Sequence, residues 1–161
     1  NVVTTADFHR DSWWYDPVAN NWTAADSIPA NITNAASFII DSSIFIVGGL
    51  NPSQVTINDN WEYNTNTHVW TQRASFPGTQ ARLGPVSMTI SNRGFYGMGV
   101  YQAGNLYMND WWEYQKSSNS WISHSSTVTL IGRYNAMTFT VSGKGYLVGG
   151  IPLNSTNCET W

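Results

Sequence analysis

The sequence predicts an all-β fold built from repeated units of four antiparallel strands, with almost no helix. An aromatic motif occurs three times at intervals of about 50 residues, and a glycine motif recurs with the same period and in a constant order. No stretch of useful length shows the apolar periodicity that an amphipathic helix requires. Because several motifs repeat together, each period is interpreted as one structural unit.

The aromatic motif pairs a tyrosine with a tryptophan seven residues later, in the segments 11–22, 59–70 and 110–121. Tyr15 and Tyr63 are 48 residues apart, and Tyr63 and Tyr114 are 51 apart. The segment 159–161 matches the start of a fourth copy. We expect Trp-Glu-Tyr to form the third strand of a unit, strand c, and the fourth strand, d, to follow the second tryptophan.

Two further motifs predict the first two strands. The apolar segments 45–49, 95–99 and 146–150 end in glycines and predict strand b, although Met98 stands at the first glycine position of the second copy. The segments 32–38, 82–88 and 133–139 lead into strand a, which alternates apolar and small polar residues. Arg82 and Arg133 open two of these copies, and Ile32 stands there in the first. Turns at 41–43, 91–94 and 142–145 predict hairpins between strands a and b.

The composition excludes several classes of protein. Charged residues make up 11% of the chain, aromatic residues make up 14%, and the net charge is −3. Disordered segments have the opposite composition, with many charged and few aromatic residues. Five arginines and two lysines are scattered along the chain, so no cationic surface for nucleic acid is expected. The apolar runs are too short to span a bilayer. A single cysteine, Cys158, excludes an internal disulfide and a cysteine-based zinc cluster.

Asparagine, serine and threonine together account for 50 of the 161 residues, and lysine is rare. This composition, together with a first residue that is Asn and not Met, predicts a processed or excised segment and an extracellular or cell-surface location. Three Asn-x-Ser/Thr sequons, at Asn21, Asn31 and Asn154, match the number expected by chance. They therefore carry no argument for glycosylation.

In order and spacing these motifs resemble kelch repeats, and their residues are most similar to those of secreted bacterial kelch proteins and galactose-oxidase-like propellers. The resemblance covers essentially the whole chain. It implies a β-propeller in which each unit is one radial blade, with about three blade-equivalents of a six- or seven-bladed ring. It also implies that the repeated glycine and aromatic residues are structural; they are Gly48, Gly49, Trp61, Tyr63, Trp70, Gly99, Trp112, Tyr114, Trp121, Gly149 and Gly150.

The resemblance implies one partial propeller domain over residues 1–161. Residues 1–30 are expected to supply strands c and d of one blade, and residues 31–80 and 81–131 two further blades. Residues 132–161 are expected to supply strands a and b and the start of c of another blade. An open arc leaves two blade faces and their strand edges uncovered. Either the remaining blades of a longer chain or a second copy of this chain would complete the ring.

The connections b–c and d–a should emerge on one face of the propeller, and they are the longer ones. The b–c loops are 50–58, 100–109 and 151–157, and the d–a loops include 74–81 and 124–132. Long loops on a rigid scaffold are frequent recognition sites. The candidate ligand-binding residues in the b–c loops are Gln54, Tyr101, Asn105 and Tyr107. The alternative for the two tyrosines is that they cover the edge of a blade.

Arg82 and Arg133 are expected at the start of strand a on the same face. In kelch domains that bind peptides, arginines at this repeat position contact acidic ligands, so the resemblance implies a ligand-binding role for both. A guanidinium group offers a planar pair of donors to a carboxylate. The alternative is that each arginine pairs with a backbone carbonyl or with an aspartate of a neighbouring blade.

Other polar residues are expected to be structural. Glu62 and Glu113 occupy equivalent positions in strand c, and we expect them to accept hydrogen bonds between blades rather than to act as a catalytic pair. Asp59 and Asp110 are expected to stabilise the turn before strand c. The three histidines fall at unrelated repeat positions, so no metal or other cofactor is expected.

Three functional hypotheses follow from these observations. The first is a non-enzymatic extracellular module that binds a protein or a glycan through its b–c and d–a loops. The second is a fragment of a propeller enzyme that acts on sugars, of the oxidase or sialic-acid epimerase type. The third is a structural subunit that assembles through its blade edges. A propeller fold by itself does not select among them.

Overall fold

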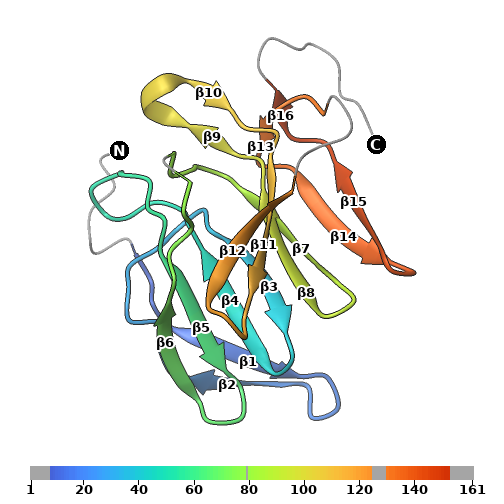
Figure 1. The fold of residues 1–161 in the computed structure, drawn as a ribbon. Coiled ribbons are helices and arrows are strands. Elements are labelled where there is room, and N and C mark those ends of the chain that lie inside the picture. The colour runs from blue at the N-terminus through green and yellow to red at the C-terminus, as the bar shows by residue number, and fades with distance from the viewer. Residues whose placement is uncertain (1–7, 79, 125–129, 153–161) are drawn as a thin grey trace.

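The computed structural model describes residues 8–78, 80–124 and 130–152. Two four-stranded sheets lie side by side, and a two-stranded hairpin flanks them on either side (Figure 1). The prediction of an all-β fold with four-stranded antiparallel units is confirmed. A single short 3₁₀ turn, Gln102–Gly104, is the only helical element in the described part of the chain.

The two complete sheets each follow the order a, b, c, d along the chain. Blade 1 consists of β3, β4, β5 and β6, and blade 2 of β7, β8, β11 and β12. Their bounds are β3 Ala36–Ile40, β4 Ser43–Val47, β5 Asn60–Asn64, β6 Val69–Arg73, β7 Val86–Ile90, β8 Arg93–Gly97, β11 Trp111–Gln115 and β12 Ser120–His124. Strand d begins one residue before Trp70 and Trp121 instead of after them, because each tryptophan pairs directly with the tyrosine of strand c.

The remaining strands form two hairpins and two short pairs. The N-terminal hairpin, β1 Ser12–Asp16 and β2 Asn21–Ala25, carries the motifs of strands c and d. The C-terminal hairpin, β14 Met137–Val141 and β15 Lys144–Val148, carries those of strands a and b. β9 Val100–Tyr101 pairs with β10 Leu106–Tyr107, and β13 Arg133–Tyr134 pairs with β16 Ile151–Pro152. Among the residues described, no helix is long and apolar enough to cross a membrane.

An aromatic core joins blade 1 to blade 2. Phe38 and Phe45 of blade 1 stack with their ring centroids 5.2 Å apart, and Tyr114 of blade 2 lies 5.1 Å from Phe45. Trp121 of blade 2 meets Phe38 edge-on at 6.2 Å. Phe38, Phe45 and Tyr114 are buried. Wide, flat rings thus fill the space between two twisted sheets, where smaller side chains would leave voids.

Hydroxyl groups join the inner strands of successive blades. The inner strand of blade 2, β7, lies beside β3 on one side and β14 on the other. Ser87 donates to the carbonyl of Ser37, and Thr138, one repeat later, donates to the carbonyl of Ser87. Thr89 donates to the carbonyl of Ile39 at 3.1 Å. The small polar residues that alternate along strand a therefore link each blade to the one before it.

The departure from the glycine motif at Met98 is explained by the blade that follows. A Cβ atom at Gly48 (φ +71°) would lie 2.6 Å from the hydroxyl of Tyr96 in the next blade. One repeat later, Leu147 stands at the position of Tyr96 and packs in a cluster with Met98. The shorter leucine leaves room for a side chain at position 98. Burial of Met98 offsets its left-handed backbone (φ +55°), which costs about 1–2 kcal/mol.

The two hairpins keep large apolar side chains exposed. Trp13 and Trp14 of the N-terminal hairpin and Met137 and Phe139 of the C-terminal hairpin are about half exposed or more. Phe139 stacks on Tyr146 as Phe38 stacks on Phe45. The hairpins thus carry the side chains of blade interiors on surfaces that a neighbouring sheet would cover.

Candidate functional site

The longer loops lie at one end of the sheets, at the top of Figure 1, and this end is called the long-loop face. The a–b and c–d turns lie at the opposite end, called the turn face. The loop between β8 and β11 folds back on itself through β9, the 3₁₀ turn and β10. It is anchored by backbone bonds of Met108 N–H to Gly99 O (2.9 Å) and Gly99 N–H to Arg133 O (2.8 Å). These bonds hold the loop at a fixed place above blade 2.

Three of the predicted ligand residues lie together in this loop. Tyr101 and Tyr107 are half-buried, and Asn105 is exposed at a left-handed position between them (φ +45°). The ring of Tyr107 lies edge-on to that of Tyr134, with centroids 5.8 Å apart. Leu106 is exposed beside them. Both tyrosines are thus partly covered, as the edge-covering alternative expects, and partly exposed; their ligand-binding role stays a prediction.

Gln54 lies over blade 1 and belongs to a separate part of the long-loop face. It lines a hollow of about 450 Å³ together with His9, Asn34 and Leu50. Its backbone is left-handed (φ +60°), and its N–H donates to the carbonyl of Asn51 at 2.9 Å. Two candidate surfaces thus share this face, one over each complete blade.

Arg82 has its guanidinium group committed to residues of its own blade. Nη1 and Nη2 each donate to a carboxylate oxygen of Asp110 at 2.7 Å, and Nη1 also donates to the carbonyl of Met98. The guanidinium carbon lies 4.7 Å from the centre of the Phe76 ring. These contacts favour the structural alternative. The partner carboxylate belongs to blade 2 itself, so the expected pairing with a neighbouring blade is wrong for Arg82.

Arg133 is also buried and bonded within its own repeat. Nε donates to the carbonyl of Ile131 at 3.1 Å, and Nη1 donates to the carbonyl of Gly149 at 3.0 Å. The backbone-carbonyl alternative therefore describes its contacts. The two arginines expected to face a ligand are consequently placed as structural ties between strand a and the end of strand b.

Asp110 does more than stabilise a turn. Burial by itself would raise the pKa of Asp110, but the hydrogen bonds from Arg82 outweigh it and hold that pKa below its usual value. Its carboxylate also accepts a hydrogen bond from Trp112 Nε1 at 2.8 Å. In blade 1, where Ile32 replaces the arginine, the equivalent Trp61 Nε1 is buried without a bonded partner.

Glu62 and Glu113 are buried carboxylates near the turn face, and their main partners lie within their own blades. Arg73 of strand d binds Glu62, and Arg93 of strand b binds Glu113 through Nε and Nη2. The expectation of bonds between blades is therefore wrong for Glu113. Glu62 has one contact between blades, an ion pair with Lys116 Nζ of blade 2 at 3.5 Å.

The stability of the protein is expected to fall as the pH drops from about 4.5 to about 2. The hydrogen bonds from Arg93 lower the pKa of Glu113 from 4.5 to about 2, against the opposing effect of burial. A carboxylate with a lowered pKa contributes stability above the pKa of the unfolded chain, and this contribution is lost as the pH falls through the folded value. Urea unfolding across this range measures the slope. Glu113→Gln should flatten it, and an unchanged slope would contradict this role.

Two of the three histidines each lie beside one polar side chain of their own blade. His68 Nδ1 lies 3.0 Å from the hydroxyl of Tyr63, and His124 Nε2 lies 3.0 Å from Glu113. Among the described residues, no three His, Cys, Asp or Glu side chains are grouped to hold a metal ion. The sequon residue Asn21 is exposed and Asn31 is half-buried, while Asn154 and Cys158 lie outside the described residues.

Comparisons with known proteins identify the repeat. Residues 32–77 match the family model described as Kelch motif. The Kelch domain-containing protein of Sulfurisphaera tokodaii is 26% identical over 147 residues, which are 88% of this chain and 20% of that protein. Kelch-like protein terF of Aspergillus terreus is 30% identical over 78 residues, which are 44% of this chain and 17% of that protein. The chain thus spans about a fifth or less of the length of these curated relatives.

The arrangement of the sheets also matches a solved structure. The structure of YjhT superimposes on 90% of this chain with a TM-score of 0.71 and 14% sequence identity. The chain covers 46% of that structure. At this identity the match concerns the fold alone, and it places the four-stranded sheets as blades of a propeller.

Proposed function

Since this chain belongs to the kelch-repeat β-propellers, we propose that it is a non-catalytic extracellular interaction module that binds a protein or a glycan through its long-loop face. The observation that carries the proposal is the anchored loop over blade 2. Tyr101 and Tyr107 flank an exposed amide at Asn105, and the loop is held by backbone bonds to Gly99. Partly exposed aromatic rings on a rigid support contribute binding energy at a low cost in conformational entropy.

Replacing Tyr101 and Tyr107 together by alanine is expected to weaken ligand binding about tenfold or more, because truncated aromatic anchors cost roughly 2 kcal/mol at an interface. Ligands are first selected for the unaltered protein from a glycan array and a phage-displayed peptide library. Affinities of the selected ligands are then compared by calorimetry. Asn66→Ala with Thr67→Ala, on the turn face, serves as the control. Equal affinities for both double variants would contradict the proposal.

We also propose that kelch blades cover the two exposed hairpins in the assembled protein. In each complete blade strand c pairs with strand b, as β5 pairs with β4 and β11 with β8. The N-terminal hairpin has strands c and d, and the C-terminal hairpin has strands a and b. The missing halves are supplied either by further blades of a longer chain or by a second copy of this one.

The 161-residue chain in isolation is expected to associate, because among the described residues β1 and β15 each have only one partner strand and the hairpins carry exposed aromatic side chains. Light scattering at several concentrations should give a mass above 18.0 kDa that rises with concentration. A discrete mass near twice 18.0 kDa would identify a second copy as the partner. Trp14→Lys with Phe139→Lys should lower the mass, and a single monomeric mass for the unaltered chain throughout would contradict the prediction.

A further inference from the structure

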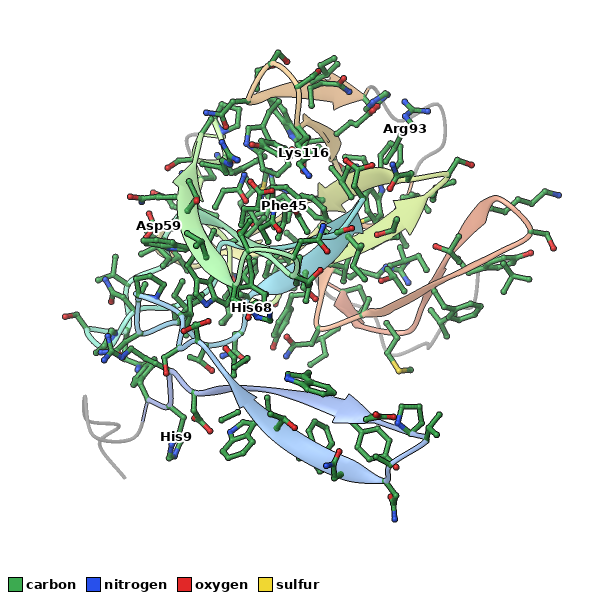
Figure 2. The ribbon with its side chains drawn as sticks, turned by 90° about the horizontal axis from the view of Figure 1, so that it is seen from below. His9, Phe45, Asp59, His68, Arg93 and Lys116 are labelled. Atoms are coloured by element: carbon green, nitrogen blue, oxygen red, sulfur yellow. The ribbon has the colours of Figure 1, made fainter. Side chains whose placement is uncertain are left out.

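A second hollow, of about 480 Å³, lies on the turn face, at the opposite end of the sheets from the loops discussed above. Three of the chain's seven lysines and arginines line it: Arg73 of blade 1, and Arg93 and Lys116 of blade 2. Figure 2 looks onto this end of the molecule and shows Arg93 and Lys116 on it. The chain as a whole is acidic and poor in cations, so three cations at one hollow are a local concentration of positive groups, which Asp41, Glu62 and Glu113 balance in net charge.

The charges around this hollow are arranged in two layers. The carboxylates of Glu62 and Glu113 lie beneath, with side chains 4% and 5% exposed. Arg73, Arg93 and Lys116 lie above them, with side chains 34%, 55% and 28% exposed. The remaining carboxylate of the lining is Asp41, at 3.4 Å from Lys116. A ligand that enters the hollow therefore meets three cationic groups, the exposed carboxylate of Asp41 and the largely covered carboxylate of Glu113, which also lines the hollow.

The buried carboxylates hold the two arginines in place. Glu113 accepts hydrogen bonds from Nε and Nη2 of Arg93, so the plane of the guanidinium is fixed while Nη1 remains outside that pair of bonds. Arg73 is held by Glu62 through Nε and Nη2. Such support reduces the conformational entropy that a guanidinium loses when it binds an anion.

The equivalent positions of the two blades show that a buried glutamate can be neutralised without placing Arg73 and Arg93 at the same hollow. Blade 1 has its arginine on strand d, Arg73, and a serine on strand b, Ser43. Blade 2 has the reverse, Arg93 on strand b and His124 on strand d. Each arrangement supplies one arginine to one glutamate. Only with the arginine on strand b of blade 2 do Arg73 and Arg93 line the same hollow.

We propose that this hollow is a binding site for a carboxylate group, which Arg93, Lys116 and Arg73 contact from the turn face. A guanidinium presents parallel N–H donors that match a carboxylate, and the ammonium of Lys116 adds a point charge. The carboxylate belongs either to a small organic acid or to an acidic side chain of a peptide. The proposal is independent of the long-loop face, because none of the residues involved lies in those loops.

The test is a titration of the ¹⁵N-labelled protein at low salt with two probes, succinate and the blocked peptide acetyl-Glu₄-amide. Saturable shifts at Arg93 and Lys116 are expected with at least one probe. Succinate alone would identify a small acid as the ligand, and the peptide alone an acidic segment. Saturation by neither probe would overturn the proposal.

Matched variants separate the site from the fold. Arg93→Ser with His124→Arg gives blade 2 the arrangement of blade 1, so Glu113 keeps an arginine partner while the hollow loses one cation. Affinity for the binding probe should fall about tenfold or more, the value of one charge-assisted hydrogen bond. Lys144→Ser removes the cation at the equivalent position of the C-terminal hairpin, outside the hollow, and should leave affinity unchanged. Equal losses in both variants would overturn the proposal.

Discussion

Arg82→Met is expected to destabilise the protein by about 3 kcal/mol, the lower end of the range for a buried ion pair, because it leaves the half-buried carboxylate of Asp110 without its cation. Arg82 is 1% exposed, and both of its terminal nitrogens donate to Asp110 at 2.7 Å. Methionine fills much of the same space, so the loss reports the polar contacts more than a cavity. Urea unfolding of the two proteins measures the difference.

A second substitution separates the ion pair from the other contacts of Arg82. In the Arg82→Met background, Asp110→Asn should recover part of the lost stability, because no uncompensated carboxylate remains. The neutral amide can still accept the hydrogen bond of Trp112 Nε1 that Asp110 accepts now. A loss of less than about 1 kcal/mol on Arg82→Met, the value of an exposed pair, would contradict a structural role for this arginine.

Phe38→Ala is expected to cost about 3–5 kcal/mol, the usual range for truncating a buried aromatic side chain. Phe38 is 2% exposed and contacts Phe45 of its own blade, and Tyr114 and Trp121 across the interface with blade 2. The cavity left by its ring lies between two sheets that are tied along their inner strands, so it cannot close by a simple collapse. Denaturant unfolding again gives the measurement.

The chain contains its own control for this substitution. Phe139 stands at the repeat position of Phe38 and stacks on Tyr146 at the same centroid distance of 5.2 Å, but it is 50% exposed. Measured at a protein concentration where light scattering gives a monomeric mass, Phe139→Ala should therefore cost at most about half as much, since the transfer term scales with the area removed from water. Equal losses in the two variants would mean that the C-terminal hairpin is covered in solution, and would reverse its description as an open surface.

The sequence predicted the architecture well because repeats constrain register. Three motifs in a fixed order specify which residues share a strand and which strands are neighbours. The predicted start of strand d was wrong by a short distance, because Trp70 lies inside the strand and pairs with Tyr63. The hydroxyl bonds between inner strands also follow a visible pattern, the small polar residues of strand a.

The contacts of the charged residues could not be predicted in the same way. Whether Arg82 meets a ligand, a carbonyl or an aspartate depends on where Asp110 lies in three dimensions, 28 residues further along the chain. The turn-face group of Arg73, Arg93 and Lys116 was missed altogether. The sequence did contain a signal for it. Blade 1 has Ser43 on strand b and Arg73 on strand d, whereas blade 2 has its arginine, Arg93, on strand b and His124 on strand d.

The loop residues are the least predictable part of the candidate site. Tyr101, Asn105 and Tyr107 lie in the b–c loop of blade 2. The equivalent loop of blade 1 closes with a single antiparallel bridge, Leu50 to Thr56, and its residues differ, so the details of the β9–β10 pair and the 3₁₀ turn do not follow from the period. Gln54 was grouped with them from loop position alone, and the structure places it beside a different hollow over blade 1. The repeats thus define the scaffold, and the insertions between them define the surface that differs from blade to blade.

The most direct test of the central claim, that the long-loop face is the binding surface, is a chemical-shift map of a selected ligand on the ¹⁵N-labelled protein. The ligand is the strongest binder obtained from the glycan array or the peptide library. We expect the largest shifts at 99–108 and at Arg133 and Tyr134, with smaller ones at 51–56. Shifts confined to the turn face, at 65–68 and 116–119, would contradict the claim and move the function to the opposite end of the blades.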